Sequence, residues 1–311
     1  MRVKKTTSRF VFTPLWYRWA SGMAPVPEGI RRRATMSILQ LPHAPPAAVL
    51  IDWHATLVDT HDAMYHAVDD VLPRLEELGL WERLLRPEES KTIEDAKLVK
   101  YVREHHKLHP KITAQRKISR TDIFEVLFGA DGDAKRRIHR AFDDCYKNYV
   151  DEVHPLEPDI RAQLERLRAA GVPVGVISNR KRDFFEHELA IVDGSGWRDL
   201  FDVTVCGDDV AHRKPAPDML LKALAELGLE PSERCWYAGD STTDVIAAKD
   251  AGITAIFYNG AHWSQSWLDK IFPGTVSHPH RPDAVVDSIG GLTGLARRML
   301  ANGKRVERAR A

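Results

Sequence analysis

Short apolar runs alternate with helical patterns along much of this chain, and this alternation limits the possible folds more than any other feature. Five runs rich in β-forming residues can be located, at 48–52, 172–178, 202–206, 235–240 and 254–259. Helical patterns precede or separate the last four, at 159–170, 216–227 and 241–251. Strands that are apolar throughout, joined by helices, are typical of a parallel sheet buried on both faces. We therefore predict an α/β fold with a parallel sheet between two layers of helices.

Two of the helical patterns end at a glycine. Gly171 follows the pattern at 159–170, and Gly252 follows the pattern at 241–251. Glycine adopts the left-handed conformation that commonly ends a helix, so both positions are predicted to be left-handed caps.

A long insertion, residues 60–154, separates the first strand from the rest of the sheet. Pro73 is expected to kink or split its first helix. The insertion is longer than an ordinary strand–helix–strand connection, so we expect a separate helical module. Its expected helices are 62–78, 88–108, 120–128 and 133–150.

Charge is distributed unevenly along the chain. Residues 1–46 carry eight Lys or Arg and one Glu, and residues 297–311 carry six basic residues and one acid. The remaining body has 31 basic and 42 acidic residues, a net charge of −11. An acidic body argues against nucleic-acid binding, which needs a positive face. We expect 1–46 to be a disordered basic extension and 297–311 to be a basic tail.

The cysteines and the hydropathy limit where the protein acts. Three scattered cysteines form no CxxC pair, which favours a reducing compartment over a disulfide framework or a zinc site. No apolar stretch approaches the length of a membrane span. We therefore expect a cytoplasmic protein without a membrane span.

Polar residues stand where the predicted strands end. The carboxyl ends of parallel strands share one edge of a sheet, so these residues are expected to meet in one crevice. Several carboxylates together need positive charge, which Lys214 and a hard cation such as Mg²⁺ would supply. This constellation suits phosphoryl transfer, because such catalysis consists largely of positioning and charge stabilisation. The residues are Asp52, Ser178, Asn179, Lys214, Asp240 and Asp244.

The same residues carry a resemblance to a known family. The chain resembles the haloacid dehalogenase (HAD) superfamily, in the branch that includes phosphoglycolate phosphatase and β-phosphoglucomutase. Four motifs occur in the family's order: DWHATLVD at 52–59, Ser178, RKPAPD at 213–218 and GDSTTD at 239–244. The resemblance implies a Rossmann-like core at 47–59 and 155–296, with a helical cap at 60–154.

The resemblance also implies roles for individual residues. Asp52 would be the nucleophile and a metal ligand, and the backbone carbonyl of His54 would also bind Mg²⁺. Asp240 would be a direct ligand, and Asp244 would support the metal site. Ser178 and Lys214 would hold the phosphoryl group, with Asn179 as a further hydrogen-bond donor. The implied activity is Mg²⁺-dependent hydrolysis of a small phosphate monoester through an aspartyl-phosphate.

Two positions depart from the family pattern. His54 stands where phosphatases of the family have an aspartate that protonates the leaving group and activates water. Histidine is the commonest general acid–base side chain, so His54 is a candidate for that role. Ala55 stands where the family has glycine, so the turn there must be compatible with alanine or slightly strained.

Several interpretations stay open at this point. Other HAD chemistry, on a phosphonate or a haloacid, competes with phosphate hydrolysis, and so does a non-catalytic binding or regulatory protein with the same fold. A basic stripe at Lys97, Lys100, Arg103, Lys107 and Lys111 either meets an anionic substrate or is a solvated helix face. Neither the substrate nor the oligomeric state follows from the sequence, and residues 261–283 match no clear structural pattern.

Overall fold

A computed structural model describes residues 41–115 and 118–310, with side chains through residue 303. Most of the expected basic extension, residues 1–40, lies outside this range. The described residues divide into two compact units, one within residues 64–146 and the other containing residues 41–63 and 147–310. The first unit lies within residues 60–154, the range of the insertion expected from the sequence.

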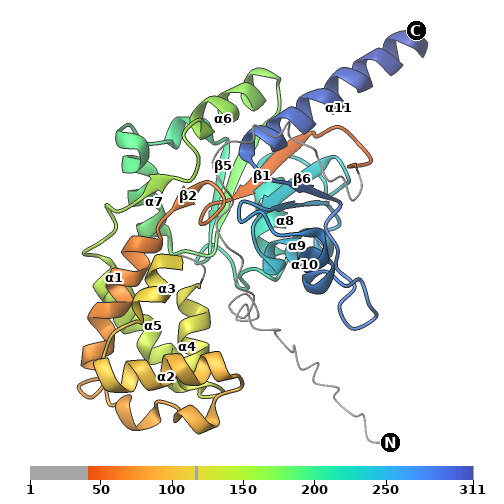
Figure 1. Cartoon of the computed structure of the whole chain (residues 1–311). Coiled ribbons are helices and arrows are strands. Elements are labelled where there is room, and N and C mark those ends of the chain that lie inside the picture. Colours follow the sequence, from red (N-terminus) through yellow and green to blue (C-terminus); the bar gives the residue numbers. More distant parts are fainter. Residues whose placement is uncertain (1–40, 116–117, 311) are drawn as a thin grey trace, which may run out of the picture. The chain divides into compact units, whose positions relative to one another are not determined.

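The second unit is built on a six-stranded sheet with the order β5-β4-β1-β6-β7-β8, and every adjacent pair is parallel (Figure 1). The prediction of a parallel α/β core is confirmed. Five of the strands lie within the predicted runs, whereas β8 was not predicted. The strands are β1 Ala48–Asp52, β4 Val174–Ser178, β5 Val203–Cys206, β6 Cys235–Gly239, β7 Thr254–Tyr258 and β8 Ala284–Val286.

Helices cover both faces of this sheet because residues along each strand alternate between the two faces. Val49 and Ile51 of β1 pack into a core formed with α6, α7 and α11, whereas Leu50 packs into a core formed with α8, α9 and α10. The continuous apolar strands of the sequence are therefore explained. The helices are α6 Ile160–Ala169, α7 Arg182–Ile191, α8 Asp218–Glu226, α9 Thr242–Asp250, α10 Gln265–Ile271 and α11 Ile289–Arg310.

Several local expectations can be compared with these elements. Gly171 and Gly252 have φ values of 79° and 70°, which confirms both left-handed caps. Helix α7 was not predicted, and α10 lies in the stretch 261–283 that the sequence left unassigned. Helix α11 was not predicted either, and it includes the basic end of the chain as far as Arg310.

The helical unit follows the predicted pattern with some differences. Pro73 lies in a short 3₁₀ turn, η2 (Leu72–Arg74), that ends the first helix early, as expected for a proline. Thr92 caps α2, so this helix starts later than predicted. The α-helices are α1 His61–Val71, α2 Ile93–His105, α3 Pro110–Gln115, α4 Arg120–Phe128 and α5 Gly132–Tyr146, and 3₁₀ turns η3 Trp81–Arg83 and η4 Pro87–Glu89 precede α2.

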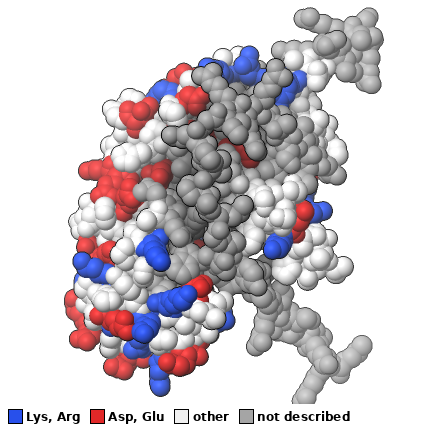
Figure 2. Space-filling view, viewed as in Figure 1, with Lys and Arg blue, Asp and Glu red and all other residues white. Residues whose placement is uncertain are grey.

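The surface of the helical unit in view carries Lys/Arg and Asp/Glu side chains side by side (Figure 2). Lys97 lies 3.0 Å from Glu94, and Lys100 lies 3.8 Å from Glu104. Arg103 donates to the backbone carbonyls of Leu84 and Leu85. These contacts favour a solvated, salt-bridged helix face for the basic stripe. Among the described residues, no helix has the length and hydropathy needed to cross a membrane.

Candidate active site

The sheet register brings the predicted acids to one edge. Asp52 is the last residue of β1, and Ile51 before it pairs with Ala238 of β6. Asp240 directly follows β6, so it lies at the same edge of the sheet as Asp52. Asp244 follows in the first turn of α9. Carboxylate oxygens of Asp52, Asp240 and Asp244 all lie within 4.8 Å of one another. Residues that are far apart in the sequence therefore form one acidic cluster.

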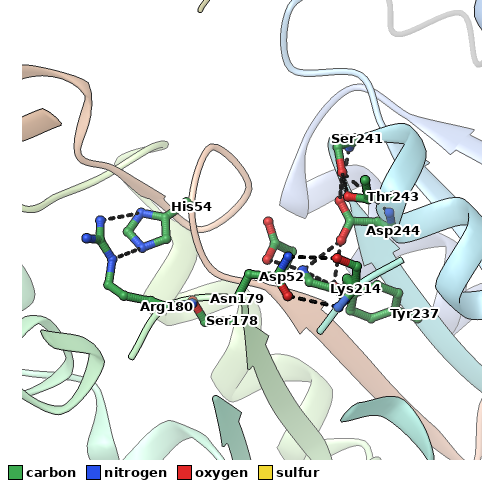
Figure 3. Close-up of polar contacts among 10 residues, drawn as sticks. All are labelled: Asp52, His54, Ser178, Asn179, Arg180, Lys214, Tyr237, Ser241, Thr243 and Asp244. Carbon is green, nitrogen blue, oxygen red and sulfur yellow. Dashed lines mark hydrogen bonds and ion pairs between the residues drawn. The ribbon is translucent and has the colours of Figure 1, made fainter. Parts of the chain in front are cut away.

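The ammonium group of Lys214 lies inside this cluster (Figure 3). Its Nζ atom donates to Asp52 Oδ1 at 2.6 Å and to Asp244 Oδ1 at 2.7 Å. It also lies 2.7 Å from the hydroxyl of Tyr237, which in turn donates to Asp244 at 2.8 Å. Burial acts against the charged ammonium, but Asp244 and Asp52 together raise the pKa of Lys214 above its usual value. Lys214 is therefore held as a cation.

One cation does not compensate three clustered acids, of which Asp52 and Asp244 are buried and Asp240 is partly exposed. Burial raises the pKa of Asp52 to about 6, although Lys214 acts in the opposite direction. Burial, Asp52 and Asp244 raise the pKa of Asp240 well above its usual value. Burial opposes the ionisation of Asp244 too, but Lys214, Ser241 and Tyr237 lower its pKa. A divalent cation would relieve the excess negative charge, and these oxygen donors suit Mg²⁺. The residues present therefore fit this metal.

Asp244 is fixed by its own helix terminus. Ser241 caps α9 by accepting from the Asp244 backbone N–H, and Asp244 Oδ2 accepts from the Ser241 backbone N–H at 3.1 Å. The other oxygen, Oδ1, already accepts from Lys214 and Tyr237. Gly239 is required nearby because a Cβ there would overlap the Asp244 carboxyl group. Both carboxylate oxygens of Asp244 therefore have partners within the protein.

Asn179 and Ser178 lie at the end of β4, at the same edge. The Asn179 amide donates to the Lys214 carbonyl at 3.1 Å and accepts from the Lys214 N–H at 3.0 Å. These two bonds hold the segment that presents Lys214 to the acids. Ser178 Oγ accepts from the Arg180 N–H at 3.2 Å, which leaves its hydroxyl proton to be donated elsewhere. Asn179 is therefore a positioning residue in this structure, and Ser178 keeps a donor for an oxyanion.

His54 lies on the opposite side of Asp52 from Lys214 and faces Arg180 (Figure 3). Its Nδ1 is 2.7 Å from Thr60 Oγ1, and its Nε2 accepts a hydrogen bond from Arg180 Nε. The site thus has an acid–lysine half and a histidine–arginine half. Trp53 is fully buried among apolar residues, as expected for a core side chain.

The turn after Asp52 has the conformation that the sequence brought into question. Ala55 has a φ of 58°, in the left-handed region where residues other than glycine are strained. Its N–H donates to the Val58 carbonyl at 2.8 Å, which closes the turn. Of the two alternatives that the sequence left open, the positive φ of Ala55 favours the slightly strained turn.

Three residues near the site were missed by sequence reasoning: Arg180, Glu188 and Tyr237. A signal for Glu188 exists, because it stands four residues after Phe184 and three after Phe185. Helical spacing therefore places it on a buried apolar face. Tyr237 lies on β6 three residues before Asp240, in a strand read only as apolar. No comparable pattern identifies Arg180.

Comparisons with known proteins show which family the chain resembles. A model of the haloacid dehalogenase-like hydrolase family matches residues 49–258. The chain is 36% identical over 138 residues to a phosphoglycolate phosphatase of Yersinia pseudotuberculosis, and 30% identical over 157 residues to one of Escherichia coli K12. These matches cover 44% and 50% of this chain, and 55% and 57% of the relatives. The chain therefore spans a little over half the length of the curated relatives it matches.

Solved structures show the same fold. A protein assigned as a phosphoglycolate phosphatase, from Lactobacillus delbrueckii, has a TM-score of 0.55 at 20% identity, over 81% of this chain and 98% of its own. A protein assigned as a haloacid dehalogenase-like hydrolase, from Bacteroides fragilis, has a TM-score of 0.53 at 22% identity, over 79% and 99%. At these identities the likeness concerns the fold alone.

Proposed function

Because this chain belongs to the haloacid dehalogenase-like hydrolase family, we propose that it hydrolyses a small phosphate monoester with Mg²⁺ through an aspartyl-phosphate on Asp52. The observation that carries the proposal is the Lys214 ammonium held between Asp52 and Asp244, beside Asp240. A buried carboxylate next to a fixed cation can approach an anionic phosphoryl group, which an isolated acid would repel.

The proposed reaction has two displacements at phosphorus. An Asp52 oxygen forms a bond to phosphorus while the bond to the ester oxygen breaks, and the leaving oxygen takes a proton. A water molecule then attacks the aspartyl-phosphate, releasing inorganic phosphate and restoring Asp52. Lys214 and the Ser178 hydroxyl stabilise the phosphoryl oxygens, and His54 is the proposed acid–base group.

Asp52, the His54 backbone carbonyl and Asp240 would hold Mg²⁺, with Asp244 supporting the site. When bound, the ion supplies positive charge to the phosphoryl oxygens. Haloacid cleavage without a metal is a weaker candidate, since it would leave Asp240 and Asp244 facing each other with only Lys214 to compensate them. Phosphonate cleavage and binding without turnover also compete with phosphate hydrolysis.

The substrate and the cellular location are part of this proposal. The matched relatives are named phosphoglycolate phosphatases, so phosphoglycolate is the first compound to test. The three cysteines are free and buried, which supports the expected cytoplasmic location.

The test is phosphate release from phosphoglycolate and a panel of other small phosphate monoesters, with and without Mg²⁺. Asp52→Asn is the control because it removes the nucleophile with almost no change in shape. We expect release to require Mg²⁺ and to fall by about 10⁴-fold or more in Asp52→Asn. Equal rates for Asp52→Asn and the unmodified protein would reject the proposal.

A further inference from the structure

A buried polar chain runs from helix α7 to the histidine half of the site. Glu188 of α7 has no solvent exposure, yet it carries a carboxyl group. Its Oε2 accepts from the Trp53 indole N–H at 2.8 Å, and its Oε1 lies 3.3 Å from Arg180 Nε. A buried carboxylate requires such partners, because an uncompensated charge inside a protein is strongly unfavourable. Glu188 therefore fixes the guanidinium of Arg180.

Arg180 in turn determines the state of the His54 ring. Its guanidinium has only donors, so the contact between Arg180 Nε and His54 Nε2 requires a lone pair on Nε2. Two longer contacts act in the opposite sense, because Glu188 Oε2 lies 3.5 Å from Nε2 and Arg180 Nη2 lies 3.4 Å from Nδ1. The shorter contact between Arg180 Nε and Nε2 outweighs both. Nδ1 then carries the proton of the neutral ring and donates to Thr60 Oγ1 at 2.7 Å. This tautomer is assigned from the hydrogen-bond network.

We propose that Arg180 and Glu188 are positioning residues that hold the His54 ring in one orientation and in the Nδ1–H tautomer. The two oxygens of an aspartate are chemically equivalent, whereas the two nitrogens of a neutral histidine are a donor and an acceptor. A histidine at this position therefore needs a partner that distinguishes its nitrogens, and an aspartate does not. The consequence for catalysis rests on the proposed function, whereas the ring geometry does not.

The ring state is tested without any substrate. Long-range ¹H–¹⁵N spectra of ¹⁵N-histidine-labelled protein at about pH 8, where an ordinary histidine is neutral, report which ring nitrogen is protonated. The chain has 14 histidines, so the His54 signals are assigned by their loss in His54→Ala. We expect the proton on Nδ1 in the unmodified protein and a changed proton distribution in Arg180→Gln.

Two further variants keep this test decisive. Arg182→Gln is the matched control, because Arg182 lies two residues after Arg180, at the first position of α7, and pairs with Glu186 and Asp209. Its His54 signals should stay unchanged. Arg180→Lys keeps a cation for Glu188 if the glutamine variant does not fold, but lacks the planar fork that reaches both partners. The His54 ring signals should change in Arg180→Lys too. A proton on Nε2 in the unmodified protein, or unchanged His54 signals in Arg180→Lys, would overturn the proposal.

Kinetics then test the catalytic consequence. Arg180→Gln should misplace the proposed acid–base group, His54, and so lower kcat by about 10- to 100-fold with little change in KM. In a His54→Ala background, Arg180→Gln should cause no further loss, because the residue it positions is gone. Multiplicative losses would show that Arg180 acts on the substrate itself, which contradicts the positioning role. If the unmodified protein hydrolyses no phosphate ester, the proposed function fails, and the spectra still decide the positioning role.

Discussion

The two halves of the site differ in how they are built. The acid–lysine half consists of residues at strand ends or in the turns that follow them, and one ammonium group contacts Asp52, Tyr237 and Asp244 at 2.6–2.7 Å. The histidine–arginine half depends on Glu188, which reaches the site from the middle of α7. The first half follows from sheet topology, whereas the second depends on side chains that pack between a helix and the sheet. The two halves are therefore expected to respond differently to substitution.

The largest effect is expected from Lys214→Met. This change leaves the buried carboxylates of Asp52 and Asp244 without their ammonium partner, so phosphate release should fall by about 10³-fold. The free energy of unfolding without Mg²⁺ at pH 7 should fall by about 3–5 kcal/mol. Phosphate-release assays and urea unfolding measure these effects. Lys222→Met is the matched control, because Lys222 forms an exposed pair with Glu226. If Lys214→Met behaves like Lys222→Met, the acid–lysine half is not the centre of the site.

A smaller effect is expected from the histidine half. His54→Ala should lower kcat by about 10²-fold, because it removes the proposed acid–base group and no partner of the acid cluster. His54→Asp should retain activity with a shifted pH profile, since aspartate is the residue that the family's phosphatases use. Rates measured across pH for both variants make the test. An alanine variant as active as the unmodified protein would remove His54 from the chemistry.

A still smaller effect should follow from Tyr237→Phe. The change removes one hydroxyl that contacts both Lys214 and Asp244, and losing one hydrogen bond at the site should cost about tenfold in kcat. Tyr258→Phe is the control, because this hydroxyl is also inside the protein but donates to Glu157. Similar activity losses in the two variants would mean that the effect reflects general destabilisation and not the position of Lys214.

The smallest effect concerns His139, which belongs to neither half. Burial lowers its pKa to about 4, and Arg120 acts in the same direction. The unfolded chain binds a proton more readily, so this contribution to stability is present above about pH 6.5 and is lost as pH falls towards 4. Between pH 6.5 and 4, the free energy of unfolding, measured with urea, should fall by about 1–2 kcal/mol less in His139→Gln than in the unmodified protein. This figure allows for partial exposure of the ring. Exposed His105→Gln is the control. Identical acid profiles for the unmodified protein and His139→Gln would contradict this assignment.

The acid–lysine half could be predicted because backbone topology decides it. Parallel strands place their carboxyl ends at one edge, so Asp52, Lys214, Asp240 and Asp244 could be grouped from strand positions alone. The pairing of His54 could not be predicted in the same way. It requires the location of α7, where Phe185 packs against Trp53, and the rotamer of Glu188, which accepts from the Trp53 indole. The dual role of Asp244 in a helix cap and an ion pair likewise depends on side-chain geometry.

The alanine at the corner after Asp52 has a consequence for motion. A glycine at position 55 would move between several regions of φ and ψ with little resistance, whereas the methyl group of Ala55 leaves only a narrow well near φ 58° on that side of the map. The backbone direction after His54 is therefore restricted at Ala55. Ala55→Gly would increase backbone freedom at this position even if the folded state were no less stable. The methyl group thus restricts the backbone conformations open to the loop that follows Asp52.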